Sequence, residues 1–230
     1  KFDLSLAHDG AIPVLEHVRR YEEKSKNKVQ VAWNGGYILN GELVGKLGLP
    51  ETYIGSPLGL VLQKSKIQAL PLFNKAALLF YKDGSLEISR VNLQAGLEIE
   101  VKGAEPVVLK ASSYNNNETK SFRYYDLLYK KNTIPAKGRR LFRFIGNQII
   151  DVIEGVEKSD VLPVGLVVSV PEKLEMSGWK KGARATFSMP GFDELTHAIE
   201  AGPMLMEKGK IDLRVERGGW KTNHSIATQA

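Results

Sequence analysis

The sequence predicts an α+β fold in which strands, paired in mixed or antiparallel sheets, outnumber a few helices. Two observations support this prediction. Short apolar runs of strand length follow one another closely, and dipeptides typical of tight turns separate several of them. The runs that we expect to form strands are Phe2–Leu6, Val29–Trp33, Leu58–Leu62, Ala77–Tyr81, Leu86–Asn92, Leu97–Val101 and Val107–Ala111.

Three dipeptides predict β-hairpins. Asp83-Gly84 lies between two apolar runs, and Asp-Gly favours the type of turn that joins antiparallel strands. Gly146-Asn147 separates residues 141–145 from 148–153, and Lys208-Gly209 separates residues 204–206 from 211–213. These turns favour antiparallel pairing between neighbouring strands.

Two segments have helical spacing. The first follows Pro13, which suits a first helical turn, and has Asp9 upstream as its expected cap. The second is predicted over Phe192–Glu200, where Asp193 complements the helix dipole and His197 is interpreted as a surface or capping residue. The apolar stripes consist of Val14, Leu15, Val18 and Tyr21 in the first helix, and of Leu195, Ala198 and Ile199 in the second.

Length and composition fit one folded domain over residues 1–230. The apolar fraction of 43% and the charged fraction of 25% exclude a disordered chain. The absence of cysteine excludes disulfides, thiolate metal sites and a cysteine nucleophile. No apolar run approaches the roughly 18 residues of a membrane span. The four histidines share no metal-ligand spacing, so we predict no metal site, and the sequence identifies no cofactor.

The net charge of +6 is concentrated in one segment, Lys120–Arg143. Eight basic residues face one acid, Asp126, in this segment, so it carries +7 and the other residues sum to −1. Interleaved aromatic residues give it the pattern of a single-stranded nucleic-acid binder. The interpretation that we favour is a hairpin with aromatic side chains on its core face and Lys and Arg on its wet face. Nucleic acid is therefore an unexpected partner.

Three short motifs, in this order, resemble the phosphodiester glycosidase family. The first is Asn34-Gly35-Gly36-Tyr37 after an apolar run, and the second is the segment 55–60, Gly-Ser-Pro-Leu-Gly-Leu. The third, residues 198–205, contains Glu200-Ala201-Gly202-Pro203 and precedes a Lys-Gly-Lys turn. The resemblance runs from about Phe2 to the end of the chain.

The resemblance implies a hydrolase that acts on a sugar joined through its anomeric carbon to a phosphodiester. It also implies an exported protein, at the cell surface, in the periplasm or secreted, and Lys1 in place of Met fits the removal of an export signal. The family continues into an Arg-x-Ala-x-Gly strand and an Asp-Gly-Gly-x-Ser segment, which this sequence does not contain. We therefore expect residues 1–230 to lack the C-terminal part of the domain, which would bring an arginine to clamp the phosphate.

The candidate site residues come from these motifs. Glu200 and Asn34 are the catalytic candidates, with Asp193 and Asp126 as weaker acids. A carboxylate near the anomeric carbon is what glycoside hydrolysis requires, and the amide of Asn34 suits sugar hydroxyls or phosphate oxygens. The expected substrate-binding residues are Gly35, Gly36, Tyr37, Asn115, Gly202 and Pro203.

Each candidate also has a purely structural interpretation. Gly35 and Gly36 fit a plain turn as well as a nest of backbone N–H groups for an anion. Glu200 fits a solvated helix end, and helix termination alone explains Gly202 and Pro203. Two other functions stay open: a polyanion-binding module that uses Lys120–Arg143, and an exported carbohydrate-binding protein without chemistry. The sequence leaves the oligomeric state open.

Overall fold

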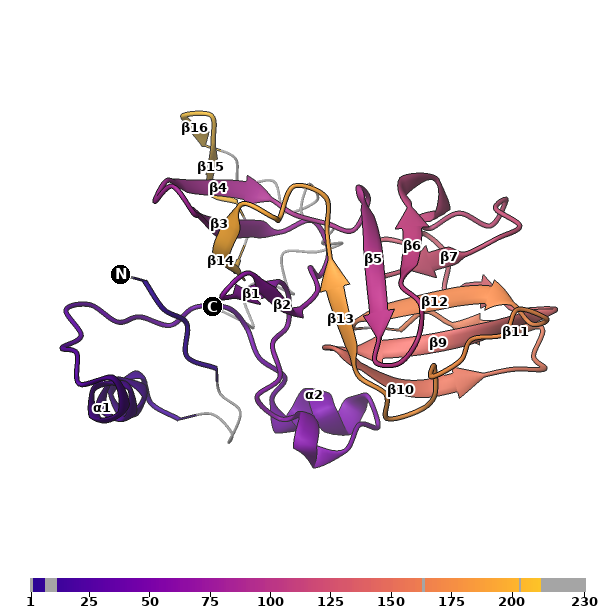
Figure 1. Ribbon diagram of the computed structural model, residues 1–230, viewed down its shortest axis with the longest axis horizontal. Helices are drawn as coiled ribbons and strands as arrows, with labels where there is room; N and C mark the ends of the chain where they lie inside the picture. Colours follow the sequence, from indigo (N-terminus) through magenta and orange to yellow (C-terminus); the bar gives the residue numbers. More distant parts are fainter. Residues whose placement is uncertain (1, 7–11, 163, 203, 212–230) are drawn as a thin grey trace.

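A computed structural model describes residues 2–6, 12–162, 164–202 and 204–211 of the chain. Over these ranges it confirms the strand-rich α+β fold, with several antiparallel sheets and two α-helices. The helices are α1 (Val14–Ser25) and α2 (Gly41–Lys46), and Glu51–Tyr53 and Ala111–Ser113 form single 3₁₀ turns. Figure 1 shows one sheet on the N-terminal side of the molecule and the remaining large sheets stacked beside it.

The first sheet has the strand order β2-β1-β14-β3-β4, with every pair antiparallel. Strand β14 comes from the C-terminal part of the described chain and lies between two strands of the N-terminal half. The arrangement therefore unites segments far apart in the sequence. The strands are β1 (Val61–Gln63), β2 (Lys66–Ala69), β3 (Ala76–Tyr81), β4 (Leu86–Arg90) and β14 (Leu195–Glu200).

The predicted helix over Phe192–Glu200 is wrong, because Leu195–Glu200 is strand β14. Its backbone pairs with β1 on one side and β3 on the other. The nine residues of the predicted helix are too few to be stable on propensity alone, whereas the two strands that flank β14 satisfy its backbone groups on both sides. His197 consequently lies on a strand, where its ring contacts Phe2 and Phe80 edge to face.

The second sheet has the order β10-β9-β12-β7 and is covered on both faces. Residues that alternate along β9 fall into two different apolar clusters: Phe142 and Phe144 in one, Leu141 and Ile145 in the other. This explains why neither face of 140–145 is purely polar. The strands are β7 (Arg123–Tyr125), β9 (Arg139–Ile145), β10 (Gln148–Ile153) and β12 (Leu166–Pro171).

The basic segment 120–143 is not a hairpin. Strands β7 and β9 both pair with β12, which lies between them. Its aromatic side chains at Tyr124, Tyr125 and Phe142 are buried as expected, but so is Arg139, which donates to Ser169 Oγ and to main-chain carbonyls. Because a third strand supplies the pairing, the segment's own sequence does not reveal it.

The third sheet and two short ladders complete the described fold. The sheet has the order β13-β5-β6, and the ladders pair β11 with β8 and β15 with β16. The strands are β5 (Gly96–Val101), β6 (Val107–Lys110), β8 (Thr133–Pro135), β11 (Lys158–Asp160), β13 (Ala185–Ser188), β15 (Met206–Glu207) and β16 (Lys210–Ile211).

All three predicted hairpins are confirmed. Gly84, Gly146 and Gly209 each have a positive φ between strands that pair antiparallel, β3 with β4, β9 with β10 and β15 with β16. In contrast, the predicted strands Phe2–Leu6 and Val29–Trp33 are wrong, since neither is assigned to a sheet. A segment with an alternating pattern forms a strand only where a neighbouring strand can pair with its backbone N–H and C=O groups.

The predicted first helix is confirmed as α1, which begins directly after Pro13. None of its residues is buried, and Figure 1 shows it at one end of the molecule, away from the sheets. The predicted cap Asp9 lies outside the described residues. Helix α2 is an element that the sequence patterns do not predict; Asn40 caps it by accepting a hydrogen bond from the Leu43 N–H at 2.9 Å.

Candidate functional site

Glu200, at the end of β14, forms the centre of the candidate site. Its side chain is fully buried, and its carboxylate accepts hydrogen bonds from two main-chain N–H groups. Leu60 N–H donates to Oε2 at 2.8 Å, and Leu72 N–H donates to the same oxygen at 3.1 Å. The carboxylate therefore fastens β14 to the chain segments on both sides of the β1–β2 hairpin.

Lys75 lies beside this carboxylate and is also buried. Its Nζ is 3.5 Å from Glu200 Oε1 and donates a hydrogen bond to the Leu58 carbonyl at 3.3 Å. The same ammonium lies 5.2 Å from the centre of the Tyr37 ring, a cation–π distance. The pair thus connects β14, the start of β3 and the Asn34–Tyr37 motif.

Burial and charge act against each other at this pair. Loss of water raises the pKa of Glu200 to about 7, although Lys75 and the two N–H donors oppose the rise. Burial likewise lowers the pKa of Lys75, against the attraction of Glu200. Since every described neighbour of the Glu200 oxygens is a donor, the geometry favours the ionised carboxylate paired with an ammonium.

Glycines allow the backbone to approach Glu200 closely. At Gly59, with φ of +128°, a Cβ would lie 2.9 Å from the Glu200 carboxyl carbon. At Gly36 a Cβ would lie 2.6 Å from the Glu200 carbonyl oxygen, a backbone atom that cannot move aside cheaply. At Gly202 a Cβ would lie 2.9 Å from the Tyr37 hydroxyl. The Asn34–Tyr37 and Glu200–Gly202 motifs are therefore in direct contact.

The structure brings five of the predicted site residues together. Gly35, Gly36, Tyr37, Glu200 and Gly202 form the contacts just described, with Gly35 beside Ile199 of β14. Asn34 is exposed at the edge of this cluster, and Pro203 lies outside the described residues. Asp193 is exposed in the turn before β14, where no helix dipole exists to complement.

Asn115 belongs to a different cluster, around Asp126. The Asp126 carboxylate is buried and accepts hydrogen bonds from Tyr114 Oη at 2.8 Å, Asn115 Nδ2 at 3.0 Å and Leu128 N–H at 2.9 Å. Burial raises the pKa of Asp126, and these donors oppose the rise. Neutral donors within a short stretch of chain satisfy this carboxylate, so the cluster has the character of a structural network.

Sequence reasoning misses Lys75 and the amides that face Glu200. A lysine next to an apolar run is usually exposed, because burying an ammonium is costly without a partner. The partner here, Glu200, is far away in the sequence. The motif at 55–60 does point to this place, since its Gly59 is the residue that makes room for the carboxylate.

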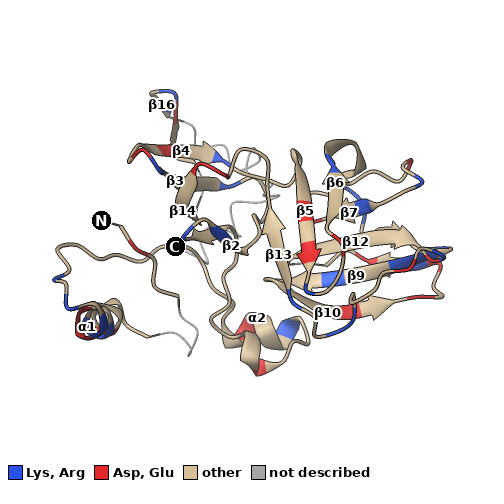
Figure 2. Cartoon of the chain, viewed as in Figure 1, with Lys and Arg blue, Asp and Glu red and all other residues tan. Residues whose placement is uncertain are grey.

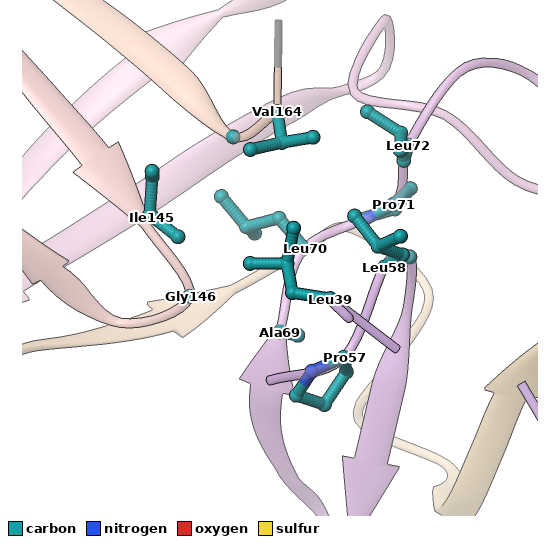
Figure 3. A pocket seen from close by; sticks show the side chains of 12 residues that line it. Leu39, Pro57, Leu58, Ala69, Leu70, Pro71, Leu72, Ile145, Gly146 and Val164 are labelled. Atoms are coloured by element: carbon teal, nitrogen blue, oxygen red, sulfur yellow. The ribbon is translucent and has the colours of Figure 1, made fainter. Parts of the chain in front are cut away.

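A small void adjoins the cluster on the side of Gly59 and Leu72. Its volume is about 20 Å³, enough for a single water molecule, and apolar side chains surround it. Figure 3 shows Leu39, Leu58, Leu70 and Ile145 around it, from separate segments of the chain. It is far too small to hold a sugar.

Three basic side chains of the segment 120–143 form ion pairs with acidic residues. Arg140 pairs with Glu154, Lys137 Nζ lies 3.4 Å from Glu157 Oε1, and Arg143 Nη1 lies 3.9 Å from Asp151 Oδ2. Figure 2 shows acidic residues next to the basic ones along β9 and β10. These pairings weaken the polyanion-binding alternative, which needs free, aligned cations.

Metal and membrane sites find no support over the described ranges. No group of three or more His, Asp or Glu side chains is gathered there in a way that could hold a metal ion. No described helix has the length and apolar composition needed to cross a membrane.

The fold and the site thus define a strand-rich α+β protein built around a buried glutamate–lysine pair. No protein-family model matches the sequence, and no curated protein matches it either. One solved structure, described as a hypothetical protein from Synechocystis, is similar at 14% identity and a TM-score of 0.44. The similarity covers 96% of this chain but 38% of that one. The resemblance to phosphodiester glycosidases accordingly rests on the sequence motifs.

Proposed function

We propose that this chain forms part of a hydrolase that cleaves a sugar-1-phosphodiester between the anomeric carbon and the phosphate oxygen. One observation carries the proposal. The Asn34–Tyr37 motif and the Glu200–Gly202 motif, two of the three motifs that carry the family resemblance, contact each other through Gly36, Tyr37 and Gly202. Motifs that build one site must lie close together in the fold, and these two do.

The chemistry assigns different roles to the exposed and the buried residues. In the reaction water attacks the anomeric carbon, the bond between this carbon and the phosphate oxygen breaks, and the phosphate monoester leaves as an anion that can take up the proton lost by the water. Asn34 and the N–H groups of Gly35 and Gly36 lie at the accessible edge, where they suit sugar hydroxyls and phosphate oxygens. These residues are the substrate contacts in our proposal.

Glu200 is a positioning residue in this proposal. A carboxylate with a pKa near 7 is chemically suited to acid–base catalysis, but both oxygens of Glu200 face Leu60, Leu72 and Lys75 inside the protein. Direct contact with a substrate would require these bonds to break. With Lys75, Glu200 instead fixes the segment that presents Asn34. As the family resemblance implies, we place the protein outside the cytoplasm.

The test is turnover of a panel of sugar-1-phosphodiesters by the full-length protein, measured as release of phosphate monoester. Asn34→Ala is expected to lower kcat/KM at least 100-fold without changing the unfolding temperature. Asn27→Ala, at an exposed asparagine outside the cluster, is the matched control and should keep wild-type rates. Equal rates in the two variants would remove Asn34 from the site. Sugar binding without product would instead indicate a carbohydrate-binding protein.

A further inference from the structure

A second, larger pocket lies between α2 and the second sheet, apart from the Glu200 cluster. Its volume of about 380 Å³ falls within the range of small-molecule sites. Residues 47–50 after α2 form one side, and β9, β10 and the segment before β12 form the other. The lining consists of Leu47, Gly48, Leu49, Pro50, Arg143, Ile145, Ile150, Asp151, Leu162, Val164 and Lys181.

Arg143 is the unusual residue of this pocket. It lies on β9 between Leu141 and Ile145, which belong to a buried apolar cluster. Its Nε is buried and finds no hydrogen-bond acceptor among the described residues. Asp151 is its partner in the strand register, but at 3.9 Å the nearest charged atoms are too far apart for a hydrogen bond. A buried guanidinium donor without an acceptor is costly, so the pocket has unused capacity to bind an acceptor.

The charges of the pocket specify the kind of acceptor. Arg143 and Lys181 contribute two positive charges and Asp151 one negative charge, so the lining carries +1. A ligand with one negative charge neutralises this net charge of +1, whereas a dianion would leave an excess of negative charge beside Asp151. The planar guanidinium fork matches a carboxylate, which accepts two parallel hydrogen bonds.

The remaining walls specify the body of the ligand. Leu47, Leu49, Ile150 and Leu162 line the pocket with aliphatic carbon. Hydroxyl groups of a sugar would lose their hydrogen bonds to water against such walls, while an alkyl chain gains by leaving water. We propose that this pocket binds a small amphipathic carboxylate, with its head group on Arg143 and Lys181 and its aliphatic chain against these leucine and isoleucine side chains.

Octanoate titrated by calorimetry into the full chain tests the proposal, with octanol as a neutral probe of the same length. We expect saturable 1:1 binding of octanoate, at least tenfold tighter than octanol. Lys181→Met should weaken octanoate two- to fivefold, while Lys180→Met, an exposed neighbour that does not line the pocket, should leave the affinity unchanged. Equal affinity for octanol and octanoate, or equal effects of the two lysine variants, would overturn the proposal.

Two further variants separate the charge contributions. Arg143→Met should weaken octanoate about tenfold or more, provided that its thermal unfolding remains cooperative. Asp151→Asn should tighten binding, because it removes the carboxylate that competes for Arg143. Asp151→Asn also decides the question if Arg143→Met does not fold: unchanged or weaker octanoate binding in Asp151→Asn contradicts the assigned head-group position. Loss of sugar-1-phosphodiester turnover has no bearing on this outcome, since Asn34, Gly35 and Gly36, the proposed substrate contacts, do not line this pocket.

Discussion

Glu200 and Asp126 are two carboxylates buried to the same degree, each with 1% of the residue exposed, and they are satisfied in different ways. Glu200 has a lysine and main-chain N–H groups from distant segments, whereas Asp126 has a tyrosine, an asparagine and a nearby N–H group. The first arrangement connects distant parts of the chain, and the second stabilises one local turn. A buried charge can therefore organise either a whole domain or a single loop, depending on where its partners lie in the sequence.

The largest expected effect is at the ion pair. Lys75→Met and Glu200→Gln should each lower the free energy of unfolding by about 3–5 kcal/mol, because each leaves its partner buried without a counter-charge. The double variant should cost clearly less than the sum of the two, since it leaves no unpaired charge. Chemical denaturation of the four proteins measures this coupling. Additive losses would mean that the two groups do not interact.

Gly59→Ala should have the next largest effect on stability. The added Cβ would meet the Glu200 carboxyl carbon at 2.9 Å, and the φ of +128° disfavours any L side chain. Gly103→Ala is the matched control, because Gly103 also has a positive φ but nothing lies within 4 Å of the place that its Cβ would occupy. We expect Gly59→Ala to cost at least about 1 kcal/mol more than Gly103→Ala in thermal unfolding. Equal costs would show that the close approach to Glu200 is unimportant.

Prediction from sequence succeeds where the determinants are local. The Gly84 and Gly146 hairpins depend on a positive φ at one position, which the turn residues themselves supply. Strand β14 is mistaken for a helix because six residues with Leu195, Ala198 and Ile199 fit either period, and only pairing with β1 and β3 decides between them.

The residues of the candidate site also fall into two groups, those that the sequence predicts and those that depend on contacts between distant segments. Glycine-rich motifs identify Gly36, Glu200 and Gly202, which the structure brings together. Lys75 cannot be found in this way, because its burial depends on a glutamate that is far away in the sequence. Asn115 resembles an exposed loop residue in the sequence, but its side chain is committed to Asp126. Interactions between distant segments are what a single sequence leaves undetermined.

Tyr114→Phe should have the smallest effect. It removes one donor to Asp126 and leaves Asn115 and the Leu128 N–H in place, so we expect a loss of only about 0.5–1 kcal/mol. Tyr21→Phe, on the exposed helix α1, is the control and should leave the unfolding midpoint unchanged. A loss in Tyr114→Phe as large as that in Lys75→Met would remove the distinction between a local and a domain-wide network.

Amide hydrogen exchange in Lys75→Met tests the central claim, that the Glu200–Lys75 pair holds the two motifs together. The relevant amides are those of Leu58, which donates to the Tyr37 carbonyl, and of Glu200 and Ala201, which donate to the Leu60 and Ala76 carbonyls. We predict faster exchange at these three positions, relative to wild type, and no change at Asn115, whose N–H donates to the Tyr124 carbonyl. Unchanged exchange at all three, or a uniform increase that includes Asn115, would contradict the account.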